Sequence, residues 1–147
     1  MKSKLWLTFT FAVCSLTAAD TKIKRNDLPA PVQQALPAIT QGATVVGFGK
    51  ETENGKTLYE IEMKSGKLTK AVTVDETGKI LTVEQEVTLA SLPPAVKASI
   101  VKTAGTAKIG RLESVTKGAE VTYEAVLTGG KTKELVIDQD GKVLSNK

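Results

Sequence analysis

Alternating apolar and polar residues run through two stretches of the chain and predict half-buried β-strands. In the first stretch Tyr59, Ile61 and Met63 share one side of the strand, because successive side chains of a strand point to opposite faces. The residues between them are polar. The second stretch has the same pattern, with Val121, Tyr123, Ala125 and Leu127 on one side and Thr122, Glu124 and Val126 on the other. We therefore expect antiparallel sheet with one covered face and one face open to solvent.

Glycine-containing turns divide the rest of the chain into further strands. Asn54-Gly55 is the clearest, because a tight hairpin turn needs the positive φ that this pair adopts readily. In two of the strands the apolar residues are three positions apart instead of two, as at Val45 and Phe48, which predicts a bulge or a strong twist. Ile109 and Leu112 show the same spacing. The expected strands span 43–53, 57–64, 67–75, 79–87, 107–117, 119–127, 131–138 and 142–146.

Two short segments have a helical period instead. In the segment that starts at residue 92, Val96 and Ile100 are four apart and so share one helix face, and proline lies at the first turn, where it is tolerated. The segment that starts at residue 28 places Val32 and Leu36 in the same way. It also contains Pro37, which predicts a break or kink near Leu36 and a shorter or more bent helix, because an interior proline removes a hydrogen bond.

The whole pattern occurs twice in the same order. Leu92-Pro93 follows Leu28-Pro29 by 64 positions, and Tyr123-Glu124 follows Tyr59-Glu60 by the same distance. The last turns, Gly78-Lys79 and Gly141-Lys142, match at a spacing of 63. Ordered matches over most of the chain predict an internal duplication.

We therefore predict an α+β fold made of two tandem repeats, each a helix packed on a four-stranded antiparallel sheet. Residues 28–87 form the first repeat, 92–147 the second, 88–91 a linker and 20–27 an N-terminal segment. A unit of about 60 residues is marginally stable alone. The two units are therefore expected to form one compact body, either by sharing a core or by continuing one sheet.

Residues 1–19 have the features of a cleaved secretory signal. Lys2 and Lys4 precede an uncharged apolar stretch that ends in small residues before Asp20. The stretch is short for a membrane anchor, which needs about 20 apolar residues. Lipoprotein processing at Cys14 is disfavoured because Val13, a bulky residue, precedes it. The sequence thus predicts a periplasmic or secreted protein whose mature part lacks cysteine and histidine.

Composition and motifs argue against several functions. The net charge is only +4 and the basic residues do not cluster, whereas a nucleic-acid-binding surface needs basic residues gathered on one face. Aromatic residues, on which bases would stack, make up 4%. Nucleic acid is therefore not expected as a partner. The chain has no histidine, so it lacks the usual base for nucleophilic catalysis and a usual ligand of zinc. Asp138 and Asp140 resemble the start of a calcium loop, but a hairpin turn explains them better. Glu60 and Glu62 could form a carboxylate pair, yet a solvated sheet face accounts for them. No catalytic residue, metal or cofactor is predicted.

The chain resembles the PepSY-like family, which groups with the β-lactamase inhibitory protein. The resemblance rests on Leu-Pro-x-x-Val, a Tyr-Glu strand, a Gly-Lys turn and an Asp-x-x-Gly-Lys-[Ile/Val]-Leu close, found twice between residues 28 and 147. It implies an exported protein without known catalysis that binds or restrains other exported proteins. The inhibitor's disulfides and aromatic-rich binding face have no counterpart here.

The predicted function is that of an exported, non-enzymatic binding protein. It would inhibit or regulate another exported protein, for example a hydrolase or a sensor, through the open face of the sheet. An alternative is a carrier of a small ligand or ion, held between helix and sheet. Tyr59 and Tyr123 could be interface anchors, but core packing is the preferred interpretation. The residues predicted to bind are Glu60, Glu62, Thr69, Thr73, Glu124, Val126, Glu134 and Val136.

Overall fold

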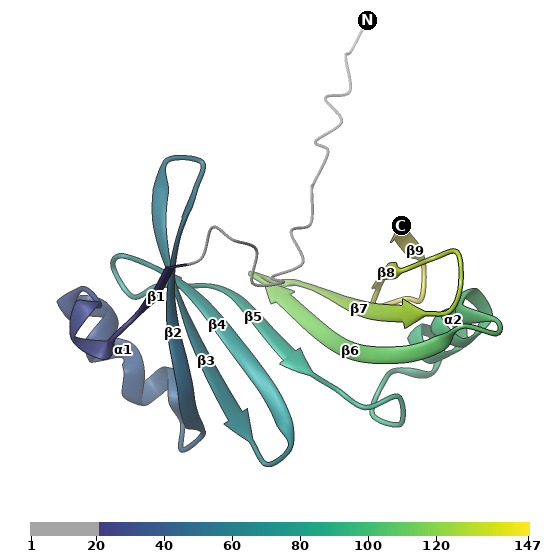
Figure 1. Ribbon diagram of the computed structural model, residues 1–147, viewed down its shortest axis with the longest axis horizontal. Helices are drawn as coiled ribbons and strands as arrows, with labels where there is room; N and C mark the ends of the chain where they lie inside the picture. The colour runs from purple at the N-terminus through teal and green to yellow at the C-terminus, as the bar shows by residue number, and fades with distance from the viewer. Residues whose placement is uncertain (1–20) are drawn as a thin grey trace, which may run out of the picture.

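One antiparallel sheet of nine strands runs through the computed structural model, which describes residues 21–147 (Figure 1). Each strand pairs with the next one along the chain, so the strand order in the sheet is β1 to β9. The strands are β1 (Thr21–Ile23), β2 (Thr44–Glu53), β3 (Lys56–Ser65), β4 (Leu68–Asp75), β5 (Ile80–Glu86), β6 (Lys108–Lys117), β7 (Glu120–Thr128), β8 (Glu134–Asp138) and β9 (Val143–Asn146).

The predicted fold class, two repeats that each have their own four-stranded sheet, is wrong. β5 and β6 pair directly from Thr82↔Lys117 to Glu86↔Glu113, so the strands of both halves belong to one sheet. β1 adds a strand from the N-terminal segment by pairing with β2. Both pairings have the same physical basis, because an unpaired strand edge leaves a row of backbone donors and acceptors unsatisfied. Of the two arrangements considered, the chain continues one sheet.

The eight expected strands lie within a few residues of β2 to β9, and the expected bulges are present. The register shifts between Val45 and Gly47 and between Ile109 and Leu112. Two further shifts, at Thr73/Val74 and Val136/Ile137, were not foreseen. β1 was missed because its three residues are too few to show an alternation.

Two helices of equal length lie at opposite ends of the molecule (Figure 1). They are α1 (Ala30–Thr40) and α2 (Pro94–Ala104), and a short 3-10 turn, η1 (Arg25–Asp27), precedes α1. The expectation of a break or a shorter first helix at Pro37 is wrong. α1 runs through this residue to Thr40, and the Pro37 carbonyl still accepts a hydrogen bond from the Gln41 backbone N–H. No helix among residues 21–147 is long and apolar enough to cross a lipid bilayer.

Each helix covers its own core on the same side of the sheet. Val32, Leu36 and Ile39 of α1 pack in one cluster, and Val96, Ile100 and Ala104 of α2 pack in another. Tyr59 is 7% exposed in the first cluster and Tyr123 packs against the second, so both tyrosines serve the cores. The strand residues of the two cores are Ile61, Met63, Val72 and Val74, and then Leu112, Ala125, Leu127, Leu135 and Ile137.

The turn before the last strand of each half packs against the start of a helix. Gly141, between β8 and β9, has a φ of +86°, and a Cβ added there would lie 2.8 Å from the Ala95 carbonyl oxygen. Gly78, between β4 and β5, has a φ of +82° and comes as close to the Pro31 carbonyl, at 2.9 Å. The Ser99 hydroxyl of α2 also donates a hydrogen bond to the Gly141 carbonyl. These contacts fix each helix on its side of the sheet.

Asp138 organises the same turn with its side chain. Its Oδ1 accepts hydrogen bonds from the backbone N–H groups of Asp140 at 3.0 Å and Lys142 at 2.9 Å. Asp75 does the same in the first half, and the hydrogen bond from the Thr77 hydroxyl lowers the pKa of Asp75. This geometry supports the hairpin-turn interpretation of these aspartates. The predicted signal peptide, with Cys14, lies outside the described residues.

Candidate binding face

The face of the sheet opposite the two helices is the candidate site, and we call it the open face. Paired residues of neighbouring strands share a face, so the register places its residues. One row of pairs runs from Gly47 through Glu62, Ala71 and Glu84 to Val115 and Thr122. A second row joins Glu86, Glu113, Glu124 and Val136.

All the predicted binding residues lie on the open face, in two groups. Glu60, Glu62, Thr69 and Thr73 are on β3 and β4, where Glu60 pairs with Thr73. Glu124, Val126, Glu134 and Val136 are on β7 and β8, where Glu124 pairs with Val136 and Val126 with Glu134. β5 and β6 separate the two groups, so the structure does not bring all eight residues together.

Sequence reasoning missed the residues that connect the two groups. Glu84 and Glu86 of β5 and Arg111 and Glu113 of β6 occupy the middle of the open face. The signal was present, because Thr82, Glu84 and Glu86 alternate along an expected strand. Without the β5–β6 pairing, however, these positions had no place in a continuous surface.

Part of the open face is buried, contrary to the expectation that this side is wet. Val136 is 1% exposed, so its side chain is not available at the surface as predicted. Val115 and Thr122, on the neighbouring strands β6 and β7, are 7% and 2% exposed. The accessible part of the open face therefore lies mainly toward β2 to β6, away from β8.

Glutamates gather along this face, and we call them the glutamate cluster: Glu60, Glu62, Glu84, Glu86, Glu113, Glu124 and Glu134. Burial is the largest cause that raises the pKa of Glu84 to about 7, and repulsion from Glu113, Glu60 and Glu124 adds to it, while Arg111 acts in the opposite direction. Burial likewise raises the pKa of Glu113, with a smaller contribution from Glu86 that Arg111 opposes. The cluster holds like charges that repel one another in a partly dry setting.

Glu124 is the most buried member of the glutamate cluster. The residue is 7% exposed and makes no hydrogen bond or ion pair among the described residues, but its carboxylate oxygens still reach solvent. Burial, together with repulsion from Glu134 and Glu113, raises the pKa of Glu124 to about 7, and attraction by Arg111 and Lys147 partly opposes this rise. A carboxylate kept in such a place costs folding free energy, which is typical of groups retained for binding or chemistry.

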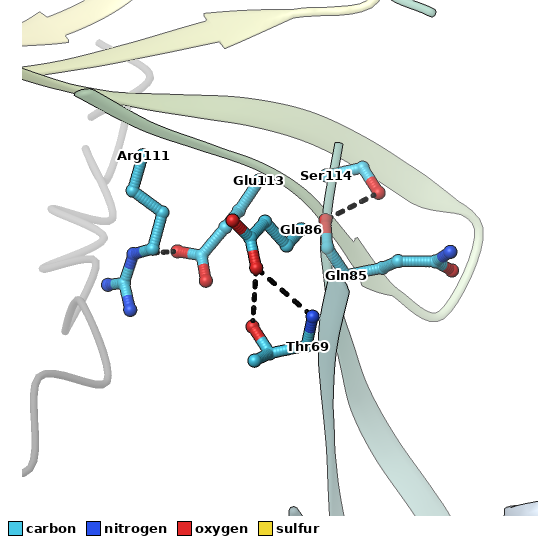
Figure 2. Close-up of polar contacts among 6 residues, drawn as sticks. All are labelled: Thr69, Gln85, Glu86, Arg111, Glu113 and Ser114. Carbon is cyan, nitrogen blue, oxygen red and sulfur yellow. Dashed lines mark hydrogen bonds and ion pairs between the residues drawn. The ribbon is translucent and has the colours of Figure 1, made fainter. Parts of the chain in front are cut away.

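Two polar contacts hold the middle of the open face in shape (Figure 2). The Arg111 Nε lies 3.3 Å from a Glu113 carboxylate oxygen along β6. The Glu86 carboxylate of β5 accepts hydrogen bonds from the Thr69 hydroxyl and the Thr69 backbone N–H of β4, each at 3.0 Å. Figure 2 shows the Glu86 and Glu113 carboxylates next to each other, as their pairing across β5 and β6 requires.

A groove crosses the open face from β2 toward β6. It consists of two adjoining hollows of about 240 and 360 Å³, which share Val46, Glu60 and Glu62. Gly47 and Gly49 of β2 lie opposite Glu62 and Glu60, and their missing side chains leave the groove open at this end. Ala71 and Glu84 line its middle, and Arg111 and Glu113 close the far side.

Replacing Thr69 by valine tests the bond that holds Glu86. We expect the free energy of unfolding to fall by about 1 kcal/mol, because valine keeps the shape and the backbone bond but cannot donate from a hydroxyl. Urea unfolding of the variant measures the change. Thr73→Val is the matched control, since Thr73 lies on the same strand and face and its hydroxyl makes no hydrogen bond among the described residues. Equal losses in the two variants would contradict a role for the Thr69–Glu86 bond.

The groove carries side chains of both charges. Among residues 21–147, no group of three or more His, Cys, Asp or Glu side chains is arranged to hold a metal ion. The glutamates in its lining are accompanied by four basic residues, Lys22, Lys64, Lys70 and Arg111. A surface of mixed charge suits contact with a protein partner.

The fold is shared with solved bacterial proteins. A protein of the DUF2874 family from Bacteroides ovatus matches 82% of this chain and 86% of its own, at 17% identity and a TM-score of 0.66. A protein described as periplasmic from Bacteroides eggerthii matches 82% of this chain and 88% of its own, at 16% identity and a TM-score of 0.67. A BLIP-like protein from Bacteroides fragilis matches 81% and 85%, at 20% identity and a TM-score of 0.64.

These similarities define a BLIP-like fold. No protein-family model matches the sequence, and a search of curated proteins finds no relative. At identities of 20% or less, the likeness to the three Bacteroides proteins concerns the fold alone.

Proposed function

We propose that this chain is an exported, non-enzymatic binding protein of the PepSY-like type that inhibits or regulates another periplasmic or secreted protein through the open face. The observation that carries the proposal is Glu124, a mostly covered glutamate that makes no hydrogen bond or ion pair among the described residues and pairs across the strands with Glu113 of the groove. Partly dry like charges lower the stability of the free protein, and a partner that neutralises them would relieve that cost. The predicted secretory signal and the periplasmic description of one structural neighbour support export.

The BLIP-like neighbour adds support for a protein partner. The carrier alternative placed a ligand between helix and sheet, but the groove lies on the opposite face from both helices. Its rows of carboxylates continue beyond the groove to Glu124 and Glu134 of β7 and β8. A surface of this extent favours a macromolecular partner over a small ligand.

Site-specific photo-crosslinking in living host cells tests the proposal. A photoreactive residue at Thr73 samples the open face, and one at Ala98, which is exposed on α2, samples the helix side. We expect one defined crosslinked protein from position 73 and none from position 98. Identical crosslinks from both positions, or none from position 73, would refute binding through the open face.

A further inference from the structure

The two halves of the sheet meet between their cores and not within one. The first core is formed by α1 with β3 and β4, and the second by α2 with β6, β7 and β8. α1 packs on β4, whereas α2 packs on β7 and β8, and Figure 1 shows the two helices at opposite ends of the molecule. A sheet is normally stabilised by burying one face against a second layer. The place where β5 pairs with β6, which we call the joint, lies away from both helices.

Polar side chains occupy the helix side of the joint. Gln85 of β5 pairs with Ser114 of β6, and Val83 pairs with Thr116. Gln85 is exposed, Ser114 and Thr116 are partly exposed, and Val83 packs against the first core. The Ser114 hydroxyl donates a hydrogen bond to the Gln85 carbonyl at 3.5 Å, which is long for such a bond. The apolar layer of the first half therefore ends at Val83 and does not continue into the second.

Carboxylates occupy the open-face side of the joint. Glu86 of β5 lies directly opposite Glu113 of β6, and like charges in opposed positions weaken a strand pair. Glu86 accepts its two hydrogen bonds from Thr69 of β4, and Glu113 forms its ion pair with Arg111 of β6. Figure 2 shows both sets of contacts. Each of these two carboxylates is thus held by its own half of the molecule.

The joint itself is a short strand pair. Residues 82–86 of β5 pair with residues 113–117 of β6, and the Val87 N–H adds one hydrogen bond to the Leu112 carbonyl at 2.9 Å. The pairs β2–β3 and β6–β7, inside the two halves, are longer and contribute residues to the cores. The joint therefore depends mainly on its backbone hydrogen bonds.

The groove on the open face crosses the joint. Its lining includes Val46, Glu62 and Ala71 from the first half and Arg111 and Glu113 from the second. Each wall is built on strands that are fixed to their own core. A change in the angle between β5 and β6 would move one wall relative to the other, so the width of the groove depends on the joint.

We propose that the two halves move as rigid bodies about the joint, so that the groove opens and closes while both cores stay folded. Hinge motion of this kind needs few stabilising contacts at the joint and well-packed bodies on either side of it. The motion belongs to the free chain and does not depend on the proposed function. It lets one groove fit protein surfaces of different curvature.

Distances between spin labels on the purified chain test this proposal. The labels are attached through Gln34→Cys on α1 and Ala98→Cys on α2, both at exposed positions, in a chain that also carries Cys14→Ser. Pulsed electron paramagnetic resonance then gives the distribution of label-to-label distances. A reference pair, Gln34→Cys with Lys64→Cys, lies within the first half. We expect the distribution between the halves to be at least about twofold wider than the reference.

A variant that stiffens the joint provides the second arm of the test. Q85V/S114V places two β-branched apolar side chains opposite each other across β5 and β6, which strengthens a strand pair. It should narrow the distribution between the halves toward the width of the reference pair. The control T52V/T57V also creates a valine pair, but between β2 and β3 outside the joint, and should leave the distribution unchanged.

Hydrogen exchange measures opening of the joint without labels. Alternate residues of β5 direct their backbone N–H groups toward β6 and toward β4. The amides that face β6 should exchange at least about tenfold faster than those that face β4, because opening the joint exposes them while the first core stays folded.

Equal protection of the two sets of β5 amides would overturn the proposal, as would label distributions of equal width in the parent chain. Narrowing by T52V/T57V as large as that by Q85V/S114V would also overturn it, since the effect would then not come from the joint. A chain that proves rigid but still gives a crosslink from position 73 would reject the joint and leave the proposed function in place.

Discussion

Replacing Gly141 by alanine should lower the free energy of unfolding by about 3 kcal/mol or more. Two costs combine at this position. A φ of +86° is strained for any residue with a Cβ, at roughly 1–2 kcal/mol. The added Cβ would also lie 2.8 Å from the Ala95 carbonyl oxygen, so α2 or the turn between β8 and β9 must shift. That shift would disturb the Ser99 hydrogen bond and the second core.

Gly118→Ala separates these two costs. Gly118 also has a positive φ, +62°, but a Cβ there meets nothing within 4 Å. This control should therefore lose only about 1 kcal/mol from the backbone strain. Urea unfolding of both variants gives the comparison. Similar losses at the two positions would show that the turn does not press on the helix as described.

The stability of the chain should depend on pH through Glu84 and Glu124. The pKa of each glutamate is about 7 in the folded protein, above the ordinary value of 4.5, so the folded state holds protons that the unfolded state has lost. Their contribution is fully favourable below about pH 4.5 and is lost as the pH rises through 7. With screening by the solvent that reaches them, the two together should cost about 2–4 kcal/mol at pH 8.

The double variant E84Q/E124Q measures this cost. It removes the two titrating groups, so its stability relative to the parent chain should increase between pH 5 and pH 8. Glu76→Gln is the control, because Glu76 lies exposed in the turn between β4 and β5. Urea unfolding at a series of pH values reports the difference. A constant gap between the double variant and the parent at all pH values would contradict the buried, repelling arrangement of the glutamate cluster.

The strands were predictable from local pattern, whereas their assembly was not. Alternation at Tyr59 to Met63 and the turn at Asn54-Gly55 are short-range signals, and the structure agrees with them. The spacing of Val45 and Phe48 also identified a real bulge. The β5–β6 pairing joins residues more than 25 positions apart across α2, and no local signal specifies such a contact. This is why the sequence predicted two repeats of a helix on a four-stranded sheet instead of one nine-stranded sheet.

The candidate site was also predictable only where it depends on local pattern. Alternation placed Glu60 and Glu124 on the uncovered side, because the face of a residue follows from its parity along the strand. The repulsion between Glu84 and Glu113, and the burial of Glu124 and Val136, depend on how strands from both halves meet. Burial of this kind is a property of the assembled sheet and cannot be derived from one strand.

At β2 the floor of the groove includes the backbone of Gly47 and Gly49, so the depth of the groove there depends on the absence of side chains. A methyl group added at Gly47 would meet the Glu62 carboxylate at 2.9 Å, which is the mobile end of a side chain and can turn away. At Gly49 the nearest atom, the Glu60 Cβ, is 3.5 Å away. Small side chains can therefore appear at either position without a change in the sheet. The depth of the groove at β2 can thus change in this chain while the nine strands and both cores keep their packing.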